Sequence, residues 1–116
     1  MNKDQVCLAL NASFSRGSTT WCSPGEDREA YLAEKSRELL ASMIDPIEVM
    51  IQGEMFPYGV RETLNQARLY AIAQHGESWL VYSPSLNVFS LAFGVSTSKL
   101  TVLGFASSDA LAEWLG

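Results

Sequence analysis

The fold is decided by residues 79–105, which read WLVYSPSLNVFSLAFGVSTSKLTVLGF. Three short apolar runs stand here, at Trp79 to Tyr82, Val88 to Phe93 and Leu100 to Phe105, and turn-forming residues separate them. Short apolar runs between breakers such as Ser, Pro and Gly are typical of strands. The stretch therefore predicts three consecutive antiparallel strands, which together form a β-meander.

The middle run of the meander has a face of large side chains and a face of small ones. The two sets alternate along the chain, with Phe89, Leu91 and Phe93 in one and Val88, Ser90 and Ala92 in the other. Alternate side chains of a strand point to opposite faces of its sheet. We therefore expect the large residues to point into a core and the small ones to lie against a close neighbour.

A capped helix is predicted upstream of the meander. Ser23-Pro24-Gly25-Glu26 has the composition of a capping box with proline at the first helical position. Residues at helical spacing then form one apolar stripe: Leu32, Ser36, Leu39 and Met43. This helix should end before Asp45-Pro46, because a residue that precedes proline disfavours helical geometry.

A strand and a second long helix are predicted next. The alternate positions of Ile47 to Ile51 carry branched apolar residues, which predicts a strand with Ile47, Val49 and Ile51 on its buried side. The helix should run from Val60 to His75 and end at Gly76, a typical left-handed cap. Its buried stripe is expected to contain four residues: Val60, Leu64, Ala67 and Ala71.

The first segment, Asn2 to Phe14, fits both a helix and a strand. Asp4 near its start and Arg16-Gly17 near its end match the charge and stop signals of a helix, so we favour the helix.

A short C-terminal helix is also expected, with Ser107 or Ser108 as its cap and Leu111 and Leu115 on its buried side. Together the elements predict an α+β fold. It would consist of an antiparallel sheet of three to four strands, packed by two long helices and the short C-terminal one. A length of 116 residues is typical of one domain, so residues 1–116 are expected to form a single α+β domain.

The composition narrows the classes of partner. The net charge is −5, from 13 acidic and 8 basic residues without a basic cluster, so no nucleic acid partner is predicted. No apolar run reaches the roughly 18 residues of a membrane span, and no signal-peptide core is present, so a cytoplasmic protein without membrane contact is expected. Only 18% of residues are charged, which favours a homo-oligomer that hides part of its surface.

Catalytic and metal-binding motifs are not found. Cys7, Cys22 and His75 lack the close spacing of metal ligands, so no metal or cofactor is predicted and both thiols are expected to be reduced. We therefore predict no enzymatic activity. An unrecognised catalytic site around Glu48, Glu62 and His75 remains a third hypothesis, and their proximity in space would be its first test.

The linker Gly53 to Gly59, GEMFPYG, carries the leading functional hypothesis. Its Met55, Phe56 and Tyr58 combine flexible and aromatic side chains in the manner of interface anchors. They predict a small acidic protein-interaction domain that self-associates, binds another protein, or binds and inhibits one. The alternative is that Met55 and Phe56 fold back as a lid over the core.

A small-molecule-binding domain is the alternative hypothesis. In the first meander strand, Tyr82 shares one face with Leu80 while Trp79 lies on the other, so cover is expected on both sides. A cavity between the sheet and the helices could use Trp79 and Tyr82 as walls and Arg68 as a polar anchor for a ligand carboxylate.

Overall fold

The computed structural model describes all 116 residues and contains four helices and six strands. The helices are α1 (Lys3–Ser15), α2 (Arg28–Ala41), α3 (Val60–Asn65) and α4 (Ala110–Leu115). The strands are β1 (Met43–Val49), β2 (Ile51–Glu54), β3 (Leu69–His75), β4 (Ser78–Ser83), β5 (Val88–Phe93) and β6 (Leu100–Val102). They form one sheet in the order β1-β3-β4-β5-β6-β2. The α+β class is confirmed, but the sheet has six strands and is mixed, because β2 pairs in parallel with β6.

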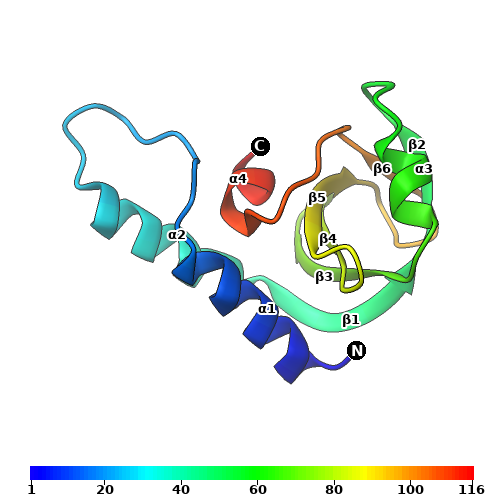
Figure 1. Cartoon of the computed structure of the whole chain (residues 1–116), viewed down its shortest axis with the longest axis horizontal. Helices are drawn as coiled ribbons and strands as arrows, with labels where there is room; N and C mark the ends of the chain where they lie inside the picture. Colours follow the sequence, from blue (N-terminus) through cyan, green and yellow to red (C-terminus); the bar gives the residue numbers. More distant parts are fainter.

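The sheet curls because one run of chain forms both of its outer strands (Figure 1). Met50 alone separates β1, which pairs with β3, from β2, which pairs with β6. The curl encloses one core, to which Leu64 of α3 also contributes. Its buried members are Val49, Ile51, Leu64, Leu69, Ala71, Trp79, Val81, Ala92, Leu100 and Val102.

A second core lies between the outer face of the sheet and the helices α1, α2 and α4, which gather on one side of the molecule (Figure 1). Its buried members are Val6, Leu10, Leu39, Ile72, Ala73, Leu80, Tyr82, Phe89, Ala110 and Leu111. The strand β4 is thus covered on both faces, with Leu80 and Tyr82 towards the helices and Trp79 and Val81 inside the curl.

The meander is present as β4, β5 and β6, and β5 has the predicted bounds. Phe89 packs in the core beneath the helices, whereas the small residue Ala92 faces the inside of the curl. Small side chains on the concave face leave room for the sheet to curl. The third strand is shorter than predicted, since β6 ends at Val102 and leaves Phe105 outside it.

The predicted second long helix is wrong. Only Val60–Asn65 is helical, and Leu69–His75 forms the strand β3 between β1 and β4. The Asn65 side chain accepts a hydrogen bond from the Ile51 amide and donates one to the Ile51 carbonyl, each at 2.9 Å, which ties the end of α3 to β2. His75 consequently lies at the exposed end of a strand, and Gly76 lies in a β-turn. Pairing on both sides of β3 outweighs the helix propensity of its alanines.

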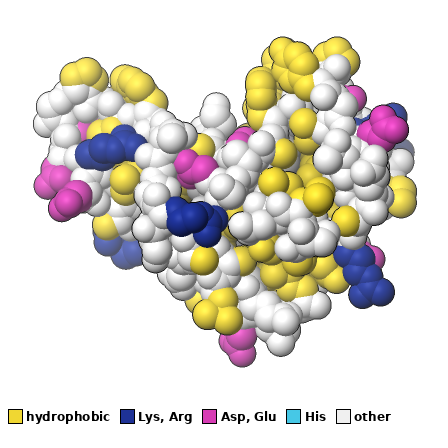
Figure 2. Space-filling view, viewed as in Figure 1, with side chains coloured by type: hydrophobic (Ala, Val, Ile, Leu, Met, Phe, Trp, Pro, Cys, Tyr) yellow, Lys and Arg dark blue, Asp and Glu magenta, His cyan; other side chains and the backbone are white.

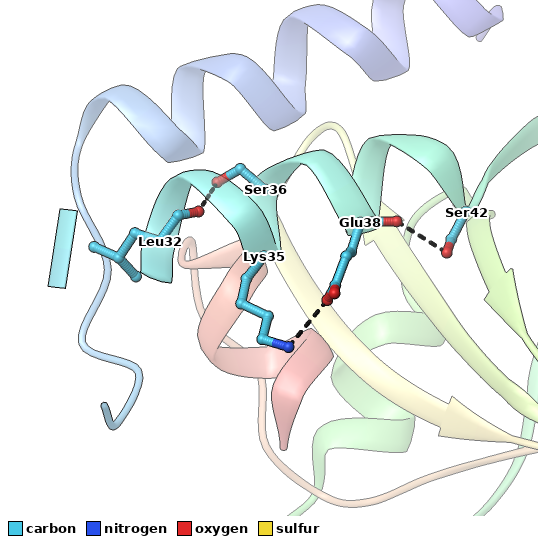
Figure 3. A network of polar contacts seen from close by, with 5 residues as sticks. All are labelled: Leu32, Lys35, Ser36, Glu38 and Ser42. Atoms are coloured by element: carbon cyan, nitrogen blue, oxygen red, sulfur yellow. Dashed lines mark hydrogen bonds and ion pairs between the residues drawn. The ribbon is translucent and has the colours of Figure 1, made fainter. Parts of the chain in front are cut away.

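The predicted capping box at Ser23 is also wrong, because α2 begins later. The N-cap is Asp27, whose carboxylate accepts hydrogen bonds from the amides of Glu29 and Ala30. Figure 3 shows the polar contacts along α2: Ser36 Oγ donates to the Leu32 carbonyl at 2.7 Å, Ser42 Oγ donates to the Glu38 carbonyl at 3.0 Å, and Lys35 pairs with Glu38 at 3.1 Å. The helix ends at Ala41, ahead of Asp45-Pro46 as predicted, and Met43 already belongs to β1.

The remaining elements match the predictions in part. The first segment is helical, and a capping box between Asn2 and Gln5 begins it. In the strand run, Val49 and Ile51 are buried, but Ile47 is 42% exposed because the register of β1 shifts between Met43 and Ile47.

At the C-terminal helix, Asp109 is the N-cap instead of Ser107 or Ser108. Leu111 is buried, whereas Leu115, in the last turn of this short helix, is exposed. None of the four helices has the length and apolar character needed to cross a membrane.

Candidate functional site

A groove of about 800 Å³ lies between α1 and the β4–β5 hairpin. One wall is a face of α1 formed by residues at helical spacing: Gln5, Leu8, Ala9, Ala12 and Arg16. The adjacent face of the same helix carries Val6, Leu10 and Ser13, which are buried against the core. Because that face is buried, Leu8 points away from the core. It lies along the groove and is 71% exposed.

The opposite wall is built from the sheet and the hairpin. Tyr70 of β3 and Tyr82 of β4 are register partners and lie side by side in this wall. Tyr82 stacks on Phe89 with ring centroids 4.5 Å apart, and its hydroxyl lies 3.2 Å from the side-chain oxygen of Asn87. Burial raises the pKa of the Tyr82 phenol, although the positive charge of Arg16 acts in the opposite direction. The neutral phenol is therefore a hydrogen-bonding group at neutral pH.

Two arginines line the groove without a carboxylate partner. Arg16 lies at the C-terminal end of α1, where its guanidinium donates a hydrogen bond to the Ser108 carbonyl at 2.9 Å. Arg68 precedes β3 and is exposed. The one ion pair of the molecule joins Lys35 to Glu38 on α2, so neither arginine is neutralised. No Asp or Glu lines the groove of a chain whose net charge is −5.

The structure brings together two of the three residues predicted for a ligand pocket. Arg68 and Tyr82 both line the groove, but Trp79 does not. Trp79 is 5% exposed inside the curl, and its indole N–H donates to the Gly94 carbonyl at 2.9 Å. The reason is strand alternation, which sends Trp79 and Tyr82 to opposite faces of β4.

Arg16 and Tyr70 also line the groove, although the sequence alone does not assign either of them to a pocket. The predicted helix from Val60 to His75 contains Tyr70, and in a helix Tyr70 would not pair with Tyr82. A signal for Arg16 was present, since Leu8, Ala9 and Ala12 form a second apolar face on α1 beside the buried one. A helix that has one apolar stripe in the core and another beside it is expected to border a groove.

A second site is an exposed group of three rings, Phe56, Tyr58 and Phe105, here called the aromatic surface. Phe56 and Tyr58 stack with centroids 6.0 Å apart, and Phe105 lies 5.7 Å from Phe56 and 5.6 Å from Tyr58. The rings remain 42%, 66% and 47% exposed, respectively. Figure 2 shows hydrophobic side chains gathered over the tip between β2 and α3.

The predicted linker residues are therefore on the surface, and the lid alternative is wrong. Met55 is 59% exposed, and neither Met55 nor Phe56 joins either core. Backbone bonds hold the linker in place: the Met55 amide donates to the Val102 carbonyl at 2.9 Å, and the Phe56 amide donates to the Leu103 carbonyl at 3.1 Å. Phe105 was missed because the sequence interpretation placed it inside a strand.

The third predicted group does not come together. Glu48 pairs with Tyr70 near the start of β3, whereas His75 lies at its end. Five residues of strand place them about 16 Å apart. Glu62 lies on α3 and is exposed. Nowhere in the structure do three or more His, Cys, Asp or Glu side chains gather in a way that could hold a metal ion.

Comparison with known proteins gives no relative from which a function could be transferred. We found no family model, curated protein or solved structure that matches this chain significantly.

Proposed function

We propose that this chain is a small-molecule-binding domain whose ligand occupies the groove between α1 and the β4–β5 hairpin. The observation that carries the proposal is a concave site of about 800 Å³ that combines apolar walls with two unpaired arginines. Ligand pockets in proteins have volumes of roughly 300 to 1,000 Å³ and place a few polar groups on a mainly apolar lining. The geometry thus favours the hypothesis that the sequence analysis ranked second.

Filling the groove is expected to abolish ligand retention. Ala12→Trp places a large ring in the groove from an exposed position on α1, so the fold should tolerate it with a change of less than about 1 kcal/mol. Native mass spectrometry of freshly purified protein is the measurement. We expect a retained small mass on the parent protein and a loss of at least about tenfold in the variant.

Ala33→Trp is the matched control, because Ala33 is exposed on α2 and does not line the groove. It should retain the same mass as the parent. Equal retention by both tryptophan variants would place the ligand elsewhere on the molecule and contradict the proposal.

A second candidate function is protein binding through the aromatic surface, either to another protein or to a second copy of the chain. The specific observation is that three rings contact one another in solvent while the core is complete without them. Aromatic side chains and methionine are enriched in interfaces because they bury large areas at low entropic cost. The cytoplasmic location and the single domain expected from the sequence stay predictions under either function.

The double substitution Phe56→Ala with Tyr58→Ala is expected to abolish self-association and leave the melting temperature nearly unchanged. Neither side chain belongs to either core, so truncating both leaves the core packing unchanged. Sedimentation velocity over a concentration series measures the association. Val95→Ala, at a 79% exposed valine outside the aromatic surface, is the control and should behave like the parent. A parent protein that stays monomeric at every concentration would contradict self-association.

A further inference from the structure

We infer that the groove beside α1 binds an amphipathic anion, a molecule with a carboxylate or phosphate head group on an apolar chain. The inference rests on the proposed ligand-binding function and specifies the chemistry of its ligand. It follows from three properties of the groove: its local charge, the free donors of its arginines, and its long apolar wall.

The local charge of the groove is opposite to that of the whole chain. Of its 12 lining residues, two are arginines and none is acidic, whereas the chain has 13 acidic residues and a net charge of −5. A cationic ligand would meet two positive charges here and no carboxylate. An anionic ligand would supply the partner that Arg16 and Arg68 lack within the protein.

Arg16 and Arg68 have unused N–H donors and lie on opposite walls of the groove. A guanidinium offers five N–H donors. Arg16 uses its Nη2 to hold the Ser108 carbonyl, and the Arg68 side chain makes no hydrogen bond within the protein. Arg68 stands two residues before Tyr70, so strand alternation places both on the same side of the chain. The flat, forked guanidinium matches carboxylate and phosphate oxygens, and Asn87 and the Tyr82 hydroxyl add neutral polar contacts.

The rest of the groove suits an apolar chain. From Gln5 to Arg16 the α1 wall is about 16 Å long at the rise of an α-helix. Leu8, Ala9 and Ala12 line this length, and Tyr70 lines the sheet wall. An extended hydrocarbon chain can cover Leu8, which is otherwise 71% exposed. Burial of that apolar area would add to the affinity supplied by the head group.

Four probes that share a twelve-carbon chain test the head group: dodecanoate, dodecyl phosphate, dodecanol and dodecyltrimethylammonium, each below its micelle-forming concentration. Calorimetry gives the affinity, and amide chemical shifts of Ala9, Ala12 and Asn87 locate the probe in the groove. We expect at least one of the two anions to bind about tenfold or more tightly than dodecanol, and the cation to bind most weakly. The stronger of the two anions identifies the head group.

Charge variants test the assigned arginine. Arg68→Gln should weaken binding of the better anion by about tenfold, and Arg68→Glu should reverse the preference towards the cation. Arg37→Gln is the matched control, because Arg37 is exposed on α2, forms no ion pair and lies outside the groove. Arg68 is preferred over Arg16 for the test, since Arg16 also caps α1 and holds the Ser108 carbonyl.

The outcomes separate the inference from the proposed function. If dodecanol or the cation binds in the groove as tightly as the anions, or if Arg68→Gln binds like Arg37→Gln, the inference is overturned while the ligand-binding function stands. If none of the four probes shifts a groove amide, the inference is overturned, and the native mass spectra of the parent and Ala12→Trp decide the ligand-binding function separately.

Discussion

Asp109→Ala is expected to lower the free energy of unfolding by about 3 kcal/mol, because this carboxylate joins two distant parts of the chain. It is the N-cap of α4, where it accepts a hydrogen bond from the Ala112 amide at 3.1 Å. It also accepts from Ser18 Oγ at 2.8 Å and from the Thr19 amide at 2.7 Å. Urea denaturation measures the loss. Asp45→Ala, at an exposed aspartate of β1 without hydrogen bonds, should change stability by no more than about 0.5 kcal/mol.

Asp109→Ala is also expected to change how much the free energy of unfolding falls at low pH. Burial raises the pKa of Asp109, but the hydrogen bonds from Thr19, Ala112 and Ser18 outweigh it, so the pKa in the folded protein lies below its ordinary value. A carboxyl group with a lowered folded pKa stabilises the fold above its unfolded pKa of about 4. That contribution is lost as the pH falls through the folded pKa.

The parent protein should therefore lose more stability than Asp109→Ala between about pH 5 and pH 2. Glu113, whose pKa is raised by burial and also by the negative charge of Asp109, acts with the opposite sign, and the substitution removes only the smaller, Asp109 part of that effect. Urea midpoints measured at several pH values give the comparison. Equal acid losses in the two proteins would show that the Asp109 hydrogen bonds do not favour its charged form.

Gly104→Ala is expected to cost about 3 kcal/mol and to disrupt the aromatic surface. Gly104 has φ +125°, a conformation that L-residues rarely adopt. An added Cβ would lie 2.8 Å from the Phe56 carbonyl oxygen and 2.9 Å from Phe56 Cβ, so the linker must move away from the end of β6. Urea denaturation measures the cost, and sedimentation velocity reports whether self-association is lost with it.

Gly17→Ala separates backbone strain from the steric clash. Gly17 has φ +81°, but an added Cβ would meet no atom within 4 Å. It should therefore cost only about 1 kcal/mol, the strain of a left-handed alanine. If both glycine variants lose the same free energy, the contact with Phe56 contributes nothing.

The sequence predicted those elements whose pattern is local. The run Val88–Phe93 matches β5 residue for residue, because its alternation and its turn-forming flanks leave one interpretation. Leu69–His75 has the composition of a helix, and only its neighbours β1 and β4 make it a strand. This strand pairing joins residues that are far apart in the chain, so the pattern within a short stretch of sequence cannot predict it.

Only part of the groove could likewise be predicted from the sequence. Residue type and strand placement assign Tyr82 to the pocket. Arg68 also lines the groove, but the helix on which it was predicted to lie ends at Asn65, so only its residue type supports the assignment. The opposite wall is α1, which is more than fifty residues away in the chain, so Arg16 could be assigned only once the packing of α1 was known. Phe105 joins Phe56 and Tyr58 for a similar reason, since the parallel pairing of β2 with β6 brings their strands together.

The curled sheet also restricts how this protein can meet other chains. The edge strand β2 has only four residues, and the Asn65 side chain already bonds the Ile51 amide and carbonyl; the opposite edge strand, β1, has seven residues. The β1 edge contains Pro46, which has no amide hydrogen to donate, and the charged residues Asp45 and Glu48. Short, charged and proline-bearing edges are poor templates for adding a foreign strand. The edges therefore favour neither edge-to-edge aggregation nor the addition of a strand from a peptide. This protein is expected to contact other molecules through its side chains instead.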